Sequence, residues 1–387
     1  MKFHNGHYIG TYGVHSLTFM RDLSKFLSVQ NNYNFMPDTD ISTIGEFGLI
    51  DRIRSIIDIR TDDALLHGHL LKGISDDAAV FRPTPGKVQL FTTDALVEGV
   101  HFDLTFMSMK HLGWKTIVVN ISDIAAMGGV PRFATIVLSL PKKISVEMVE
   151  EFYRGAVAAC KQYSCMIVGG DTTTSMANMT ISCALIGEAD EAHIRYRSGA
   201  TPGEYLCVSG HLGGSLAGLK ILSREKQRFE QSADQSTFKA NLEPYTPALE
   251  RHLMPHPRLD ISKFLTERVK CGALIDISDG LASEVHHICK NSGGGATISE
   301  HNIPIESSTQ KIAEELSDSP TKYALFGGEE YELLFTISDG DFEKLEKLTN
   351  DVTIIGRITA PEKGIVLVRE DGTEEPLPPG GWNHFTK

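Results

Sequence analysis

Asp76 and Asp77 stand side by side in the stretch Gly73-Ile74-Ser75-Asp76-Asp77-Ala78-Ala79-Val80, which has no Lys or Arg between Ser75 and Val80. Adjacent carboxylates repel each other, and burying either one without compensation costs several kcal/mol. The pair therefore needs solvent, a basic partner or a bound cation. Taken alone, the stretch is more typical of an Asp-rich turn. Its recurrence along the chain favours the cation.

A second stretch, Phe91-Thr92-Thr93-Asp94, puts two hydroxyls and a carboxylate at the end of a buried strand predicted over residues 88–92. Oxygen ligands on short side chains suit Mg²⁺. We expect most of the carboxylate stretches at or beside the ends of apolar strands, where the loops of an α/β sheet gather ligands. A shared site for several Mg²⁺ ions is the sharper interpretation, and a set of solvated turns and helix caps is the alternative. The five stretches are Asp76-Asp77, Asp94, Asp123, Gly170-Asp171 and Asp276-Ile277-Ser278-Asp279.

Length and composition narrow the class of protein. A chain of 387 residues predicts two domains of about 150 residues or more each. A hydrophobic fraction of 41% with 22% charged residues is typical of a soluble globular protein. The net charge of -13 argues against nucleic acid or an anionic membrane as a partner, because both require a positive field. No apolar run approaches the ~18 residues that span a bilayer.

The cysteines show neither CxxC spacing nor paired histidines, and most of them have apolar neighbours. This pattern predicts reduced thiols in the core of a cytoplasmic protein. The residues concerned are Cys160, Cys165, Cys183, Cys207, Cys271 and Cys289.

Helical and strand patterns alternate from residue 44 onward, which predicts a mixed α/β fold. Residues 223–241 are charged and nearly free of large apolar side chains, which predicts an exposed loop or surface helix. Helices are expected over residues 44–57, 109–127, 145–163 and 281–290 and from residue 215. Strands are expected over residues 88–93, 133–140, 166–168, 179–187, 205–209, 331–337, 352–359 and 365–369, with a strand and turn over 274–280.

The composition turns polar over residues 190–203, which predicts a boundary between an N-terminal domain, 41–190, and a C-terminal domain, 191–387. Residues 1–40 form a poorly patterned extension without the basic and apolar regions of a signal peptide. Met36 immediately precedes the patterned part of the chain. We expect either that translation starts there or that the extension is loosely attached.

Glycines accompany two of the possible anion sites. Gly169-Gly170 before Asp171 allows backbone N–H groups to approach an anion closely. Gly210, Gly213 and Gly214 precede a predicted helix and have either this role or one in helix–strand packing. The sequence has no GxxxxGK[ST] motif, no protein-kinase HRD and DFG set, no HExxH and no GxSxG.

As an ordered set, several motifs from Ile44 to the C-terminus resemble those of the thiamine-monophosphate kinase family. The set is specific, although each motif alone is weak. The motifs are Gly45-Glu46-Phe47, Leu49-Ile50-Asp51-Arg52-Ile53, Thr92-Thr93-Asp94-Ala95-Leu96-Val97-Glu98-Gly99-Val100-His101-Phe102, Asn120-Ile121-Ser122-Asp123-Ile124-Ala125-Ala126-Met127-Gly128, Gly169-Gly170-Asp171-Thr172, Arg197-Ser198-Gly199-Ala200, Asp276-Ile277-Ser278-Asp279-Gly280-Leu281 and Gly327-Gly328-Glu329-Glu330-Tyr331-Glu332-Leu333.

The resemblance implies a reaction and a fold. The expected reaction is ATP-dependent phosphorylation of thiamine monophosphate to thiamine diphosphate by direct in-line transfer, assisted by several Mg²⁺ ions. The expected fold is the two-domain one shared with aminoimidazole ribonucleotide synthetase. In that fold the N-terminal domain binds ATP and Mg²⁺, and its sheet pairs with that of a second copy into a barrel across a homodimer.

The resemblance also implies roles for individual residues. Asp123, Asp171 and Arg197 are expected to act on the transferring group. Ser75 is a departure, because relatives usually have Gly there, and this puts only the local backbone in doubt. The implied metal ligands are Asp77, Thr92, Thr93, Asp94, Asp123, Asp171, Asp276 and Asp279. The implied nucleotide contacts are Gly170, Asp171, Arg197 and Ser278, and the implied thiamine monophosphate contacts are His101, Glu329 and Trp382.

Physical chemistry agrees with this assignment. The acceptor is a phosphate monoester that is already anionic, so charge screening and alignment matter more than a general base. An indole face of Trp382 over the thiazolium cation would contribute ~0.5–2 kcal/mol, and the alternative for Trp382 is a plug in the C-terminal core. Arg197 is able to fork onto phosphate oxygens, and its alternative is a surface ion pair.

Four other functions are weighed against this one. Selenophosphate synthetase is expected to carry a reactive cysteine in an early Gly-rich loop, and no cysteine here precedes Cys160. Aminoimidazole ribonucleotide synthetase has different signatures at the substrate end. A two-metal hydrolase would release phosphate without an acceptor. A non-enzymatic Mg²⁺ or nucleotide sensor would bind ATP without turnover.

Overall fold

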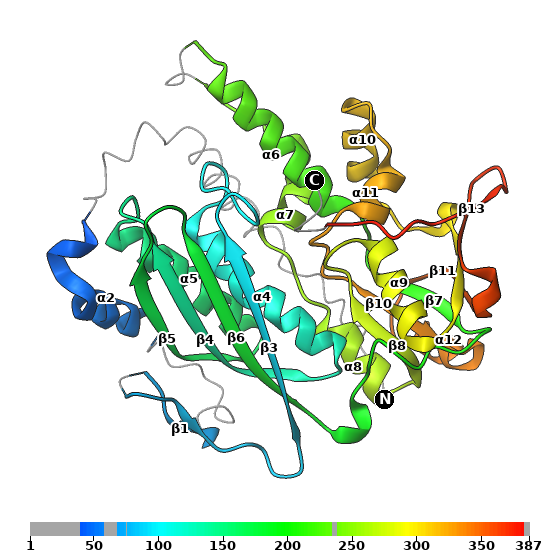
Figure 1. Ribbon diagram of the computed structural model, residues 1–387, viewed down its shortest axis with the longest axis horizontal. Helices are drawn as coiled ribbons and strands as arrows, with labels where there is room; N and C mark the ends of the chain where they lie inside the picture. Colours follow the sequence, from blue (N-terminus) through cyan, green and yellow to red (C-terminus); the bar gives the residue numbers. More distant parts are fainter. Residues whose placement is uncertain (1–38, 58–67, 75, 234–237, 383–387) are drawn as a thin grey trace, which may run out of the picture.

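The structure is a computed structural model that describes residues 39–57, 68–74, 76–233 and 238–382. Two β-sheets lie side by side, and helices pack against each of them (Figure 1). The predicted extension over 1–40, apart from its last two residues, and the departure at Ser75 lie outside the described residues. The mixed α/β class predicted from the alternating patterns is confirmed.

The first sheet has four strands in the order β3-β6-β4-β5. Only β4 and β5 run parallel. Helices α4 and α5 cover one face of this sheet, and no described helix covers the other (Figure 1). The elements are β3 (Val88–Val97), α4 (Met109–Ala126), β4 (Val130–Leu140), α5 (Val146–Gln162), β5 (Met166–Thr174) and β6 (Thr180–Ala189).

Helix α4 is the central element, because every one of its residues except Lys110 and Asp123 is buried. The Ser108 hydroxyl caps its first turn, and Gly128 follows its end with φ 76°, as a C-terminal glycine signal predicts. A Cβ at Gly113 would lie 1.9 Å from the carbonyl oxygen of Phe152 on α5. The sequence therefore uses glycine where the two helix backbones meet.

Two smaller elements complete the N-terminal part. Helix α2 (Ile41–Ile57) is interrupted at Gly45, where φ is 67°. The hairpin of β1 (Leu70–Lys72) and β2 (Val80–Phe81) packs on the side of the sheet opposite the helices. There the Phe81 and Phe133 rings lie 4.8 Å apart between centroids. Asp76 and Asp77 occupy the exposed turn of this hairpin.

The second sheet has seven strands in the order β13-β12-β9-β11-β7-β10-β8, all antiparallel except for β12 beside β9. Its strands are β7 (Tyr205–Ser209), β8 (Cys271–Asp276), β9 (Gly295–Ser299), β10 (Leu333–Ile337), β11 (Val352–Thr359), β12 (Ile365–Val368) and β13 (Glu374–Pro376). The helices of this part are α6 (Gly214–Glu230), α7 (Thr246–Leu253), α8 (Leu259–Glu267), α9 (Leu281–Ser292), α10 (Ser307–Glu315), α11 (Pro320–Phe326) and α12 (Asp339–Leu345). Short 3₁₀ turns are η2 (Glu191–His193), η3 (Glu243–Tyr245), η4 (Glu300–Asn302) and η5 (Pro361–Lys363).

The two parts share apolar packing. Ile221 on α6 and Leu249 on α7 belong to the same buried cluster as Ile117 on α4. Helix α4 also contacts β8, the edge strand of the second sheet. The side chains of α4 are therefore held by both parts of the molecule, which fixes how the two sheets sit relative to each other.

Several boundaries differ from those predicted. The strand expected to end at Thr92 continues to Val97, and the strand expected over 166–168 continues to Thr174. Three predicted site residues therefore lie inside strands and not at their ends: Thr92, Asp94 and Asp171. Successive side chains of a strand point to opposite faces, so polar residues can occupy it without interrupting the backbone hydrogen bonds between strands. The segment after residue 223, expected to be an exposed loop or a surface helix, begins as the outer half of α6, which runs to Glu230.

One other prediction from the sequence, that of reduced thiols in the core, is confirmed. All six cysteines are free and buried. None of the described helices is both long and apolar enough to cross a bilayer.

Candidate active site

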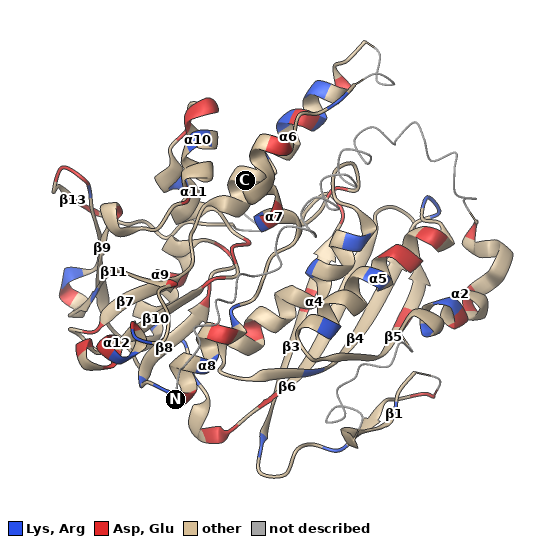
Figure 2. Cartoon of the chain, turned by 180° about the vertical axis from the view of Figure 1, so that it is seen from behind, with Lys and Arg blue, Asp and Glu red and all other residues tan. Residues whose placement is uncertain are grey.

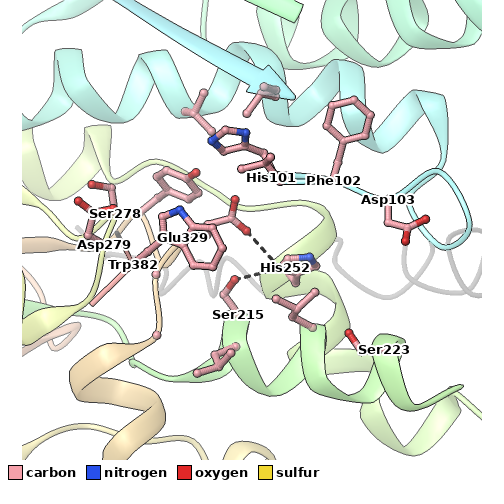
Figure 3. A pocket seen from close by; sticks show the side chains of 18 of the residues that line it. His101, Phe102, Asp103, Ser215, Ser223, His252, Ser278, Asp279, Glu329 and Trp382 are labelled. Atoms are coloured by element: carbon pink, nitrogen blue, oxygen red, sulfur yellow. Dashed lines mark hydrogen bonds and ion pairs between the residues drawn. The ribbon is translucent and has the colours of Figure 1, made fainter. Parts of the chain in front are cut away.

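A cavity of about 640 Å³ lies where α4 and the loop after β3 face the second sheet and α6. Figure 3 shows the cavity with His101 and Phe102 on one side, Glu329 and Trp382 in the middle, and Ser215 and His252 on the other side. The predicted site residues that line it are Asp94, His101, Asp123, Asp276, Ser278, Asp279, Glu329 and Trp382.

Three carboxylates from three elements meet at one end of the cavity. Asp94 comes from β3, Asp123 from α4 and Asp276 from the end of β8. Each strand alternates its faces, so Thr92 and Asp94 share the face of β3 that α4 covers. There the Thr92 hydroxyl donates a short hydrogen bond to Asp123.

The charge of Asp123 repels those of Asp94 and Asp276. Burial and the charge of Asp123 raise the pKa of Asp94 to about 6. Burial and the same charge raise the pKa of Asp276 to about 7. Burial also raises the pKa of Asp123, although the Thr92 hydrogen bond and Arg197 work against this rise. The cluster has more negative charge than its neighbours compensate.

This donor set fits Mg²⁺, because it offers hard carboxylate oxygens in a setting short of positive charge. Within the described residues, no group of three or more His, Cys, Asp or Glu side chains is already arranged around a common metal position. The metal-ligand roles stay predictions.

The loop after β8 carries Ser278 and Asp279 into the cavity. The backbone N–H of Asp279 donates to Glu284 Oε1 on α9 at 3.1 Å. Glu284 is buried, and its Oε2 has no hydrogen-bond partner among the described residues. Burial raises the pKa of Glu284 to about 8. The sequence pattern did not single out this acid.

Glu329 lies in a tight loop that packs on the same segment. Its φ is 64° and that of Tyr331 is 54°, in the left-handed region that non-glycine residues rarely adopt. The Glu329 N–H donates to the carbonyl of Ser278 at 2.7 Å, and the Tyr331 N–H donates to that of Ile277 at 2.9 Å. These bonds join the Glu329 loop to the loop of Asp276 and Asp279.

The other predicted substrate contacts are also held by the backbone. The Val97 N–H donates to His101 Nδ1 at 3.0 Å, so the proton of a neutral imidazole is assigned to Nε2. The backbone N–H of Trp382 donates to the carbonyl of Asp279 at 2.9 Å, while the residue stays 53% exposed at the cavity. Trp382 is therefore not a plug in the C-terminal core.

Several predicted site residues do not line the cavity. The strand register pairs Asp171 with Val137, three strands away from β3, on the face that α4 and α5 leave uncovered. The Thr93 hydroxyl donates to the carbonyl of Cys183 at 3.0 Å. Arg197 is exposed but lies near enough to Asp123 and Asp276 to act on their charges. Asp77, in the hairpin turn, and Gly170, next to Asp171, also lie outside the cavity lining.

Comparison with known sequences places both parts of the chain in one class. A family model described as AIR synthase related protein, N-terminal domain, matches residues 75–189, and one described as AIR synthase related protein, C-terminal domain, matches residues 201–369. The fold and the site thus define an AIR synthase related protein of two domains.

Similarity over nearly the whole chain identifies the family within this class. The chain is 36% identical over 346 residues to the thiamine-monophosphate kinase of Aquifex aeolicus. The aligned region covers 89% of this chain and 99% of the relative. The chain belongs to the thiamine-monophosphate kinase family, as its motifs predict.

Solved structures agree with this placement. The crystal structure of thiamine-monophosphate kinase from Stenotrophomonas maltophilia K279a has a TM-score of 0.70 and 31% identity, covering 86% of this chain and 98% of that one. A structure described as "AaThiL complexed with AMPPCP and TMP" has a TM-score of 0.67 and 34% identity, covering 90% of this chain and all of that one (100%). The two-domain fold expected from the resemblance is confirmed.

Proposed function

We propose that this protein transfers the γ-phosphoryl group of ATP to thiamine monophosphate, which gives thiamine diphosphate and ADP. A phosphate oxygen of the acceptor forms the new bond to phosphorus as the bond to the β–γ bridging oxygen breaks. The observation that carries the proposal is the juxtaposition in one cavity of the Asp94–Asp123–Asp276 cluster with Glu329 and Trp382. Family membership and the relative's complex with AMPPCP and TMP support it.

Several Mg²⁺ ions are part of the proposal. Asp94, Asp123, Asp276 and Asp279 are the cavity carboxylates that would hold them. Mg²⁺ held there would supply positive charge that screens the repulsion between two anionic reactants. Because an ionised acceptor needs no general base, the residues act by orientation and electrostatics. In-line geometry is the expected path.

The remaining roles follow the family positions. We assign Gly170, Asp171, Arg197 and Ser278 to ATP and His101, Glu329 and Trp382 to thiamine monophosphate. His101 would present Nε2–H as a donor, since its Nδ1 already accepts from Val97. Trp382, about half-exposed at the cavity, would place its indole face against the thiazolium cation.

A homodimer is also proposed. Strands β3 and β5 are the edges of the first sheet as described. On its uncovered face Phe91 is 71% exposed and Val137 is 38% exposed. Edge strands and apolar faces of this kind favour association. Pairing β5 of one copy with β3 of another would close a barrel and bring Asp171 of one chain toward Asp94 of the other.

The remaining expectations concern environment and partners. Figure 2 shows acidic and basic residues interspersed along α5 and α6, with no purely basic stretch on either helix. With a net charge of -13, the protein is not expected to bind nucleic acid or a membrane. The six free, buried thiols support a cytoplasmic location.

The test is ADP release from Mg-ATP with and without thiamine monophosphate, with chromatographic identification of the product. We expect ADP release that depends on the acceptor, together with the appearance of thiamine diphosphate. ADP release that ignores the acceptor would indicate a hydrolase. Absence of ADP release in both reactions would overturn the proposed activity.

A further inference from the structure

Lys115 is a fully buried lysine on α4, the helix held between the two halves of the chain. Its side chain is 0% exposed, and its Nζ lies 2.6 Å from Glu329 Oε1. Glu329 belongs to the C-terminal half, whereas α4 belongs to the N-terminal half. A buried ammonium is costly unless it is paired, so this contact is a defined feature of the cavity wall.

Lys115 also contacts the other side of the cavity. Its Nζ is 3.4 Å from the main-chain carbonyl of His101, a longer contact than the one to Glu329. His101 and Glu329 are two of the three positions assigned to thiamine monophosphate. One buried ammonium thus lies between substrate positions that come from different halves of the chain.

Of the groups that face Glu329, Lys115 supplies the compensating charge. His252 Nδ1 lies 3.4 Å from Glu329 Oε2, but burial and Lys115 lower the pKa of His252 to about 4, so its ring is neutral. Despite burial, which works against it, the charge of Lys115 holds the pKa of Glu329 below its usual value.

The Glu329 carboxylate still reaches the cavity, because 25% of its side chain is exposed and it lies on the cavity wall. Figure 3 shows it between His252 and Trp382. Its loop has the left-handed φ value given above, a conformation that persists only where surrounding contacts fix it. Lys115 holds one oxygen, and His252 lies beside the other.

We propose that Lys115 is a positioning residue for the thiamine monophosphate site and acts by holding Glu329 as an oriented acceptor at the cavity wall. This inference rests on the proposed function. Because the pair is neutral overall, Glu329 would accept a hydrogen bond from the substrate and would not attract its thiazolium charge. ATP and the Mg²⁺ cluster do not depend on this contact.

The experiment compares Lys115→Met, Glu329→Gln and the double variant in the full-length protein. We expect Lys115→Met to raise the KM for thiamine monophosphate about tenfold and to change the KM for ATP less than about twofold. The double variant should have a KM for thiamine monophosphate within about threefold of that of Glu329→Gln, because Lys115 acts through Glu329. Calorimetric titration with thiamine monophosphate should show the same order of affinities.

The matched control is Glu188→Gln. Glu188 is 3% exposed and pairs with Arg132 at 2.7 Å, on the first sheet and outside the cavity lining. This variant also breaks a buried ion pair. We expect it to lower the melting temperature and leave the KM for thiamine monophosphate unchanged. If Glu188→Gln raised the KM for thiamine monophosphate as much as Lys115→Met does, the effect would come from the loss of any buried ion pair. Lys115 would then have a structural role only.

Two results would overturn the proposal. One is a folded Lys115→Met protein with an unchanged KM for thiamine monophosphate. The other is a double variant that binds thiamine monophosphate much more weakly than Glu329→Gln does. This second comparison does not use the Lys115→Met protein, so it can be made even if that variant does not fold. Failure of the proposed function would differ, because the wild-type protein itself would then make no thiamine diphosphate.

Discussion

The hydroxyl of Ser122 on α4 donates a hydrogen bond of 2.7 Å to Oδ2 of Asp276 at the end of β8. Both residues are buried, and they belong to different halves of the chain. The bond occupies one oxygen of Asp276 and leaves the other for a ligand. Ser122 therefore orients a carboxylate that we assign to Mg²⁺.

We expect Ser122→Ala to raise the Mg²⁺ concentration that gives half-maximal turnover about tenfold, because partners of metal ligands tune affinity to this extent. The measurement is a Mg²⁺ titration of thiamine diphosphate formation. Ser262→Ala is the control, since the Ser262 hydroxyl is also buried and donates to the carbonyl of Ala125 on α4 at 2.6 Å. An equal shift in both variants would contradict a specific role for Ser122.

Removing one charge from the cluster should separate activity from stability. We expect Asp123→Asn to lose most turnover, because a ligand shared among ions is lost, while the protein stays folded. Without Mg²⁺ its melting temperature should equal or exceed that of the wild type, since repulsion with Asp94 and Asp276 is relieved. Calorimetry with and without Mg²⁺ checks this. Turnover close to that of the wild type would remove Asp123 from the site.

Stabilisation by Mg²⁺ should grow with pH. The pKa values of about 6 for Asp94 and about 7 for Asp276 are raised above the unfolded value, so this part of the metal-free stability is full below about pH 4 and is lost as pH rises through 6 to 7. Bound Mg²⁺ requires the ionised forms and reverses that loss.

The gain in melting temperature on adding Mg²⁺ should therefore be small near pH 5.5 and large near pH 8. Scanning fluorimetry at fixed ionic strength measures it. Asp276→Asn serves as the control and should flatten the dependence. A gain that is the same at both pH values in the wild type would show that protons and Mg²⁺ do not compete for these carboxylates.

Trp382 should affect binding more than chemistry. We expect Trp382→Ala to raise the KM for thiamine monophosphate ~2- to 30-fold, which corresponds to a loss of ~0.5–2 kcal/mol of cation–π attraction. Its kcat should change less. The variant Trp382→Phe keeps an aromatic face, so its KM for thiamine monophosphate should lie between those of the wild type and Trp382→Ala. Steady-state kinetics measures both constants. An unchanged KM for thiamine monophosphate in Trp382→Ala would show that Trp382 does not contact this substrate.

Mixing two inactive variants tests the proposed dimer. If each site takes Asp94 from one chain and Asp171 from the other, chains of Asp94→Asn and Asp171→Asn refolded together will form heterodimers with one intact site. Random pairing then restores about a quarter of wild-type activity, whereas each variant alone stays inactive. No recovery in a mixture shown to contain heterodimers would place Asp94 and Asp171 in separate roles.

Local patterns were sufficient to predict the main elements. The ends of α4 followed from apolar spacing and the glycines after Met127, and its length differs by one residue from the prediction. Strands were predicted too short at Thr92 and Val168, because polar residues inside a half-buried strand resemble a strand end. Helices α7 and α8 were not predicted, since short helices have few residues from which to read a period.

By itself the sequence determined the family, the mixed α/β class, the free buried thiols and the identity of the carboxylates, because these depend on residue type and order along the chain. Only the tertiary structure decided which carboxylates meet. It brought Asp94, Asp123 and Asp276 together and placed Asp171 on the other face of the sheet. It also showed that Lys115 and Ser122 contact site residues that lie 214 and 154 residues away in the sequence. Contacts at such separations depend on how two sheets pack around one helix, and local sequence patterns do not contain that information.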